Sequence, residues 1–275
     1  MSESHRRPGK IPTPYDDWKP PLNSDSGLPD YWPMPPRSVV LKFEDIPHAH
    51  SLTLSQNGGR TLSKVSNRHI SSLEKFPESL ASLTSLFEQP REELCEAATF
   101  LMNASSATIF AQFKTKWKQF LFSLERAHLK TVRLSKHGAG RVWAQEERER
   151  QKVDPLLLYL RESRNEAEHG VEEVVLEGPA SLSIGTPKGY SGAMADVVMG
   201  DGTIVVTHRM NSIPCVLTRR AWDVRVNSIV VRNHAKVKPP TMHMSKHIDS
   251  LDPIAFACLA LNYHRDALLR SSRVN

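Results

Sequence analysis

A guanidinium, an amide and an imidazole lie within one short stretch of this sequence, Arg164-Asn165-Glu-Ala-Glu-His169. Arginine binds phosphate or carboxylate groups through its planar fork of N–H donors, and histidine takes up or releases a proton near neutral pH. On an ideal helix Arg164 and His169 lie about 140° apart around the axis and roughly 7.5 Å along it. One straight helix therefore does not aim both at a single phosphate, whereas two copies facing each other across a dimer axis can.

Arg164 occupies an unusual position, because it interrupts an apolar stripe. Leu157 and Leu160 precede it and Ala167 follows it at three- and four-residue steps, so the pattern predicts an apolar side chain at 164. A charge there is costly unless it is paired or faces an interface. Two interpretations remain open. Either Arg164 serves a site between two chains, or it forms an ion pair with Glu168 while the histidine ends the helix at the negative end of its dipole.

The helix that carries these residues has clear ends in the sequence. Asp154 is a good N-cap, Pro155 suits the first helical position, and Gly170 provides a stop, which predicts a helix over 155–169. Three acidic residues share this helix with the motif: Glu162, Glu166 and Glu168. Their negative charge disfavours the approach of an RNA phosphate.

The stretch PLLLYLRESRNEAEHG resembles the motif helix of the HEPN family. The signature of that family is an Arg followed after four to six residues by a His, often with Asn directly after the Arg, at the end of a late bundle helix. Known HEPN nucleases are helical bundles that dimerise through this helix. The resemblance covers 73–170, and it implies an HEPN-like bundle there and a homodimer formed through the helix 155–169.

The resemblance also implies an activity, that of a metal-independent endoribonuclease acting as an RNA-directed toxin or defence protein. In that chemistry the His acts as general acid and base on a ribose 2′-OH and its leaving 5′-oxygen, while the Arg and the polar residue hold the phosphate. The implied catalytic residues are Arg164, Asn165 and His169 from each of two chains, and the products end in a 2′,3′-cyclic phosphate or a 3′-phosphate. RNA and an antitoxin or other partner protein are the implied partners. The alternative is a non-catalytic HEPN-like interaction module that binds a protein or a nucleic acid, in which Arg164 and His169 are structural.

A basic segment supplies a candidate nucleic-acid surface. Between Lys114 and Lys136 the sequence has seven Lys or Arg residues against one acid, Glu125, in a chain of net charge +6. The residues predicted to contact phosphates are Lys114, Lys118, Arg126, Lys130 and Arg133. A solvated basic helix face explains the same pattern equally well.

No other pattern predicts a metal or a cofactor. His243 and His247 have the spacing of metal-binding histidines on a helix, but no Glu or third ligand accompanies them. Cys95, Cys215 and Cys258 are widely separated, which fits reduced structural thiols. No glycine-rich loop leads from a strand into a helix, so a phosphate loop is not predicted. We therefore expect neither a cofactor nor a metal.

The periodicity divides the chain into five segments and predicts an α+β fold. These are a proline-rich extended arm at 1–37, short strands and a loop at 38–72, the helical bundle at 73–170, an antiparallel β region at 171–240, and a C-terminal helix within 241–275 that packs back. Aromatic residues at helical spacing within 107–137 are expected to form core. No stretch approaches the roughly 18 consecutive apolar residues of a membrane span, so we expect a soluble cytoplasmic protein.

Overall fold

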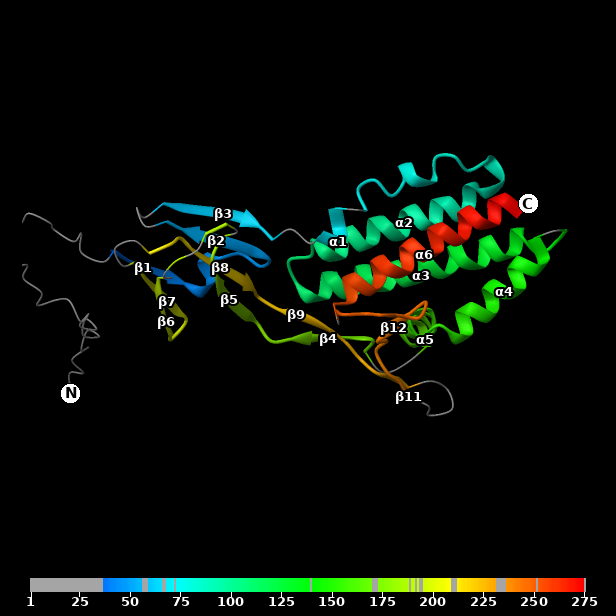
Figure 1. Cartoon of the computed structure of the whole chain (residues 1–275). Coiled ribbons are helices and arrows are strands. Elements are labelled where there is room, and N and C mark those ends of the chain that lie inside the picture. Colours follow the sequence, from blue (N-terminus) through cyan, green and yellow to red (C-terminus); the bar gives the residue numbers. More distant parts are fainter. Residues whose placement is uncertain are drawn as a thin grey trace, which may run out of the picture.

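Figure 1 shows the fold of the chain as a computed structural model. The structure describes residues 37–55, 59–65, 68–71, 73–138, 140–169, 173–187, 189–190, 192, 195–208, 212–230, 236–250 and 252–274. The predicted arm at 1–37 therefore lies outside the described residues, apart from Arg37 at the start of the first strand.

Five long helices form one half of the described part of the molecule (Figure 1). They are α2 (Glu88–Ser105), α3 (Phe110–Leu134), α4 (Gly140–Val153), α5 (Pro155–His169) and α6 (Pro253–Val274). Shorter turns are α1 (Arg68–Ser71) and the 3₁₀ segments Phe43–Asp45, Glu78–Leu80 and Ser85–Phe87. No helix in the described part of the chain has both the length and the apolar composition that a bilayer crossing needs.

One large apolar core holds the helices together. Phe113, Trp117 and Phe120 follow one face of α3 and are buried, so these members of the predicted aromatic stripe belong to the core. Helix α6 contributes Phe256 and Leu268 to the same core. It contacts both α2 and α3 and lies along them in Figure 1, so the C-terminal helix packs back onto the bundle.

Two small antiparallel sheets form the other half of the molecule. The first has the order β1-β7-β6, with β1 at Arg37–Lys42, β7 at Thr203–His208 and β6 at Asp196–Gly200. The second has the order β3-β2-β8-β5, with β3 at Arg60–Lys64, β2 at His50–Leu54, β8 at Cys215–Arg220 and β5 at Ser181–Gly185. Side chains of both sheets, among them Leu41, Leu54, Ile204 and Leu217, form a second apolar core.

Both sheets combine strands from before and after the helices. Strand β1 pairs with β7, so that Val39 lies opposite Val206, and β2 pairs with β8, so that Leu52 lies opposite Leu217. The segments predicted separately at 38–72 and 171–240 therefore share two sheets. The β region both precedes and follows the helical bundle in sequence, whereas the prediction placed its sheet only after the bundle.

An antiparallel ribbon connects the sheets to the helices (Figure 1). It consists of β4 (Val175–Gly178) and β9 (Asp223–Val226). Asn227 directly follows β9. Its backbone N–H donates to the carbonyl of Val174, and its own carbonyl accepts a hydrogen bond from the Tyr159 hydroxyl at 2.7 Å. The ribbon is thus attached to α5. The remaining short strands are β10 (Ile229–Val230), β11 (Lys236–Val237), β12 (Met242–His243) and β13 (Lys246–His247).

The beginning of the predicted bundle is less helical than expected. Leu80, Leu83 and Phe87 are buried, in keeping with their apolar spacing. The segment 73–87 nevertheless forms turns and two 3₁₀ segments. Pro77 within this segment lacks a backbone N–H donor, which disfavours a continuous helix.

Candidate functional site

The N-terminus of α5 is held by a buried carboxylate. Asp154 Oδ1 accepts hydrogen bonds from the backbone N–H groups of Leu156 and Leu157, both at 3.1 Å, which confirms the predicted cap. The same carboxylate binds His243 Nδ1 at 3.0 Å and the backbone N–H of Met244 at 2.7 Å. Burial opposes the charge, but these hydrogen bonds together hold the pKa of Asp154 below its usual value.

His243 therefore belongs to the cap of α5. His247, its predicted neighbour in a weak metal motif, instead contacts Asp249 at 2.9 Å. Among the described residues, no group of three or more His, Cys, Asp or Glu side chains comes together to hold a metal ion.

Arg164 is paired with two carboxylates and packs against an aromatic ring. Its Nη1 lies 2.5 Å from Glu168 Oε2, as one of the two sequence interpretations predicts. Its Nε lies 2.6 Å from Glu125 Oε2 on α3, an ion pair by distance in which the N–H does not point at the oxygen. The guanidinium carbon lies 5.0 Å from the centre of the Phe122 ring. The charge that interrupts the apolar stripe is thus neutralised by one carboxylate on α3 and one on α5.

The other motif residues lie beside Arg164. Asn165 accepts a hydrogen bond from Arg164 Nη1 at 3.3 Å and donates one to Glu162 at 3.2 Å. Glu162 also accepts two hydrogen bonds from Arg161. His169 is the last residue of α5, and its side chain lies outside the described part of the structure.

Several carboxylates surround the motif. Four carboxylates lie on α5 or face it from α3: Glu125, Glu162, Glu166 and Glu168. The guanidinium groups of Arg161 and Arg164 contact three of them, Glu162, Glu125 and Glu168. Burial raises the pKa of Glu125, and the Arg164 charge opposes this effect. These carboxylates attract the guanidinium groups of Arg161 and Arg164 and repel a phosphate.

The predicted basic surface of α3 is largely neutralised by acids. Arg126 contacts Glu93 at 2.7 Å and Glu96 at 2.9 Å, and Lys130 contacts Glu93 at 2.7 Å. Lys114 contacts Glu173. Two of the five predicted residues, Lys118 and Arg133, make no ion pair with any other described residue. These two are about 22 Å apart along the helix, so they do not form a continuous stripe.

A cavity that the sequence did not reveal lies next to the motif. It has a volume of about 220 Å³ and is lined by residues of α3, α4, α5 and α6, including Glu125, the partner of Arg164. His128 of α3 and His264 of α6 lie in its wall, with ring centres 5.5 Å apart. Burial, followed by the charges of Arg148 and Arg161, lowers the pKa of His128 to about 4. Both imidazoles are therefore neutral at neutral pH, since burial also lowers the pKa of His264.

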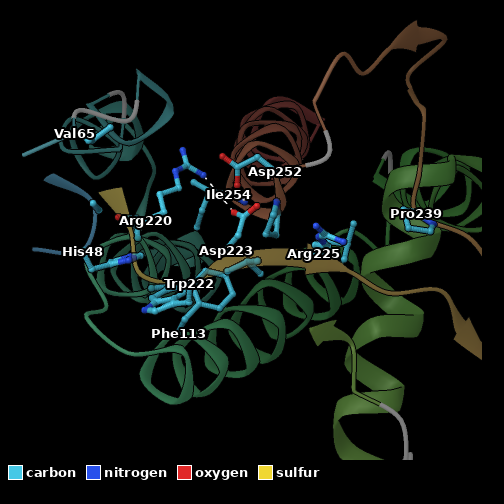
Figure 2. Close-up of a pocket in the computed structure, with 16 residues that line it drawn as sticks. His48, Val65, Phe113, Arg220, Trp222, Asp223, Arg225, Pro239, Asp252 and Ile254 are labelled. Carbon is cyan, nitrogen blue, oxygen red and sulfur yellow. Dashed lines mark hydrogen bonds and ion pairs between the residues drawn. The ribbon is translucent and has the colours of Figure 1, made fainter. Parts of the chain in front are cut away.

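A larger pocket lies where the sheets meet the helices (Figure 2). It has a volume of about 640 Å³, and Figure 2 shows Arg220, Asp223 and Asp252 near its centre. His48 stacks on Trp222 with ring centres 4.3 Å apart, and its Nδ1 accepts a hydrogen bond from the backbone of Ala221. Arg220 contacts Asp223 at 3.4 Å. The pocket thus carries charges of both signs, and they are at least partly paired with each other.

Comparison with known proteins does not assign the chain to a family. No family model matches the chain, and neither the curated proteins nor the solved structures contain a significant match. The resemblance to HEPN proteins therefore rests on the residues of α5.

Proposed function

We propose that this chain is a non-catalytic, HEPN-like interaction module. The observation that carries the proposal is the pairing of Arg164 with Glu125 and Glu168. An RNA phosphate would have to displace one of these carboxylates and then lie beside the other. A like charge at about 4 Å costs roughly 1–4 kcal/mol, depending on how well water screens it. A structural role for Arg164 is therefore favoured over phosphate binding.

An exposed apolar row on the first sheet supports the binding of another protein. Val40 and Val198 both lie opposite Val205 in the strand register, so the three side chains form a row across β1, β7 and β6. Val40 is 62% exposed and Val198 is 66% exposed. Apolar side chains exposed side by side suit contact with a partner protein of flat, apolar surface. We refer to these three residues as the valine row.

The catalytic part of the proposal is tested with RNA. Purified wild-type protein is incubated with mixed RNAs in EDTA, together with the Arg164→Ala and His169→Ala variants. We expect no cleavage above background from any of the three proteins. Cleavage by the wild type that both variants lose would instead establish the motif as a nuclease site.

The binding part is tested by a charge placed in the valine row. Proteins cross-linked to the wild type in cells are compared with those cross-linked to Val198→Lys and to Val142→Lys. Val142 is 68% exposed on α4 and serves as the matched control. We expect one set of partners to be lost from Val198→Lys alone. Identical sets for all three proteins would rule out the valine row as the contact surface.

A second candidate is the composite ribonuclease, and one contact favours it. Arg164 and Asn165 touch each other at 3.3 Å, and both side chains are only partly buried at the end of α5. If two such ends faced each other in a homodimer, each would present the motif to a shared cleft. A monomer in light scattering would exclude the ribonuclease, which requires the homodimer, whereas the interaction module does not require it. A stable dimer that cleaves RNA in EDTA would favour the second candidate.

A further inference from the structure

The cavity beside the motif has an apolar interior. Five leucines line it, and we call it the leucine pocket: Leu121, Leu124 and Leu129 from α3, and Leu157 and Leu160 from α5. Helix α4 closes the remaining side with Arg148, Gln151 and Lys152. Cavities that combine apolar side chains with a small number of polar groups are typical of small-molecule sites.

One polar group in the pocket wall has no partner. Gln151 is 7% exposed, and its Nε2 makes no hydrogen bond within the described structure. Buried amide groups nearly always find a partner, because an unmade hydrogen bond destabilises the folded state. A ligand that offers an oxygen acceptor at this point would satisfy the Gln151 amide.

A cation lies one turn before Gln151 on the same helix. Arg148 lines the pocket, and no ion pair joins it to another residue of the described chain. The other two basic residues in the wall are engaged, since Arg161 contacts Glu162 and Lys152 contacts Glu149. The pocket therefore has one guanidinium available for an anion.

The remaining polar groups limit how much negative charge the pocket accepts. Glu125 lines the same cavity and adds a carboxyl group of its own. His128 and His264 are neutral at neutral pH because burial lowers their pKa values. One available cation beside a carboxyl group suits a singly charged anion better than a doubly charged phosphate.

We propose that the leucine pocket binds a small amphipathic monocarboxylate. Its carboxylate would pair with the fork of Arg148 and accept the hydrogen bond of Gln151, and its aliphatic or aromatic body would lie among the leucines. This site is separate from the question of RNA cleavage, because it does not use the side chain of Arg164, Asn165 or His169.

Calorimetry with matched probes tests the proposal on the full chain at neutral pH. Octanoate and phenylbutyrate are the acids. Octanol and octylamine are the controls for octanoate, because they have an aliphatic chain of the same length with a neutral or a positively charged end group. We expect the acids to bind and both controls to bind at least about tenfold more weakly, as the loss of a charge-assisted pair predicts. Equal binding of octanol, or no binding of either acid, would overturn the proposal.

Variants locate the site. Arg148→Met keeps the aliphatic stem and removes the charge, and we expect it to weaken octanoate binding about tenfold or more. Arg141→Met makes the same change at an exposed position of α4 outside the pocket and should leave binding unchanged. Leu129→Trp, at a partly exposed leucine of the pocket wall, should block entry of the body of the acid. Circular dichroism confirms that each variant is folded, and wild-type affinity in folded Arg148→Met would contradict the site.

Discussion

Arg164 Nε on α5 lies 2.6 Å from Glu125 Oε2 on α3, and Glu125 is at the same time part of the wall of the leucine pocket. Glu125 therefore connects Arg164 with the pocket. Because burial raises the pKa of Glu125 while the charge of Arg164 opposes this rise, the state of that carboxyl depends on where the arginine lies. A substitution of Arg164 is thus expected to alter the protonation of Glu125 in the pocket wall.

The Arg164–Glu125 pair should contribute measurably to stability. Both side chains are about three-quarters buried, so the pair is screened less than a surface ion pair. We predict that a double-mutant cycle of Arg164→Met and Glu125→Gln, followed by urea unfolding, gives a coupling energy of about 1 kcal/mol. The coupling should fall only slightly in high salt.

Arg161→Met provides the control for this cycle. Arg161 lies on the same helix, but its ion pair is with the adjacent Glu162. We expect its coupling to Glu125 to be smaller than that of Arg164. Fully additive effects of Arg164→Met and Glu125→Gln would show that the ion pair between these two side chains does not stabilise the fold.

Asp154 should be a more important helix cap than Asp252. Asp154 receives hydrogen bonds from α5 and also from His243 and Met244, whereas Asp252 caps α6 through Ile254. We predict that Asp154→Ala lowers the free energy of unfolding by about 2–3 kcal/mol and Asp252→Ala by about 1 kcal/mol. If thermal or urea unfolding showed equal losses of stability for the two variants, the contacts of Asp154 with His243 and Met244 would not stabilise the fold.

The hydroxyl of Tyr263 should stabilise the bundle through Glu147. It donates to both carboxylate oxygens, at 2.8 and 2.9 Å, and Glu147 is fully buried. Tyr263→Phe removes this donor and leaves Arg150 as the remaining contact, at 3.5 Å. We predict that this substitution lowers the free energy of unfolding, measured with urea, by about 1–3 kcal/mol. Tyr190→Phe, at an exposed tyrosine, should change stability by less than about 0.5 kcal/mol.

Acid should destabilise the fold through the two buried histidines. The pKa of His128 is about 4 in the folded chain and about 6.5 in the unfolded chain. Between these values the unfolded chain binds more protons, so stability is fully present above about pH 6.5 and is lost as the pH falls toward 4. The shift of His128 corresponds to a loss on the order of 3 kcal/mol, and His264 shifts in the same direction.

Urea unfolding across this range checks the histidine prediction. His128→Gln should flatten the dependence of stability on pH, whereas His247→Gln, at an exposed histidine, should not. Glu125, Arg148, Arg161, Glu147 and His264 lie near His128 and remain in both variants. If the free energy of unfolding of His128→Gln depended on pH as it does in the wild type, other groups would be the cause of the acid sensitivity.

Features of α5 were predictable because they are local. Its start depends on Asp154 and Pro155, and the Arg164–Glu168 pair follows from a spacing of one turn. The contact of Arg164 with Glu125 was not predictable, since Glu125 lies on another helix. The strong basic pattern of α3 was misleading for a similar reason. Glu93 on α2 neutralises part of it, and no pattern within α3 reveals that.

The segments that contain strands were predictable, but the partners of the strands were not. The β-branched residues of Ser38–Lys42 indicate a strand, yet they do not show that β1 pairs with β7. The leucine pocket was missed because it depends on how α4 packs across α3 and α5. Arg148 and Gln151 belong to a helix that reads as polar, and only its packing shows that they face a cavity.

The pairing of β1 with β7 has a consequence for synthesis of the chain. Ser38 and Thr207, which share a hydrogen bond across these strands, are 169 positions apart in sequence. Strand β1 must therefore leave the ribosome and remain without its partner until the helices from α2 to α5 and the strands β4 to β6 have followed. Long-range pairing of this kind slows folding and exposes intermediates to aggregation. A chain that stops after α5 would carry β1, β2 and β3 without β7 and β8, and we expect such a fragment to require a chaperone to stay in solution.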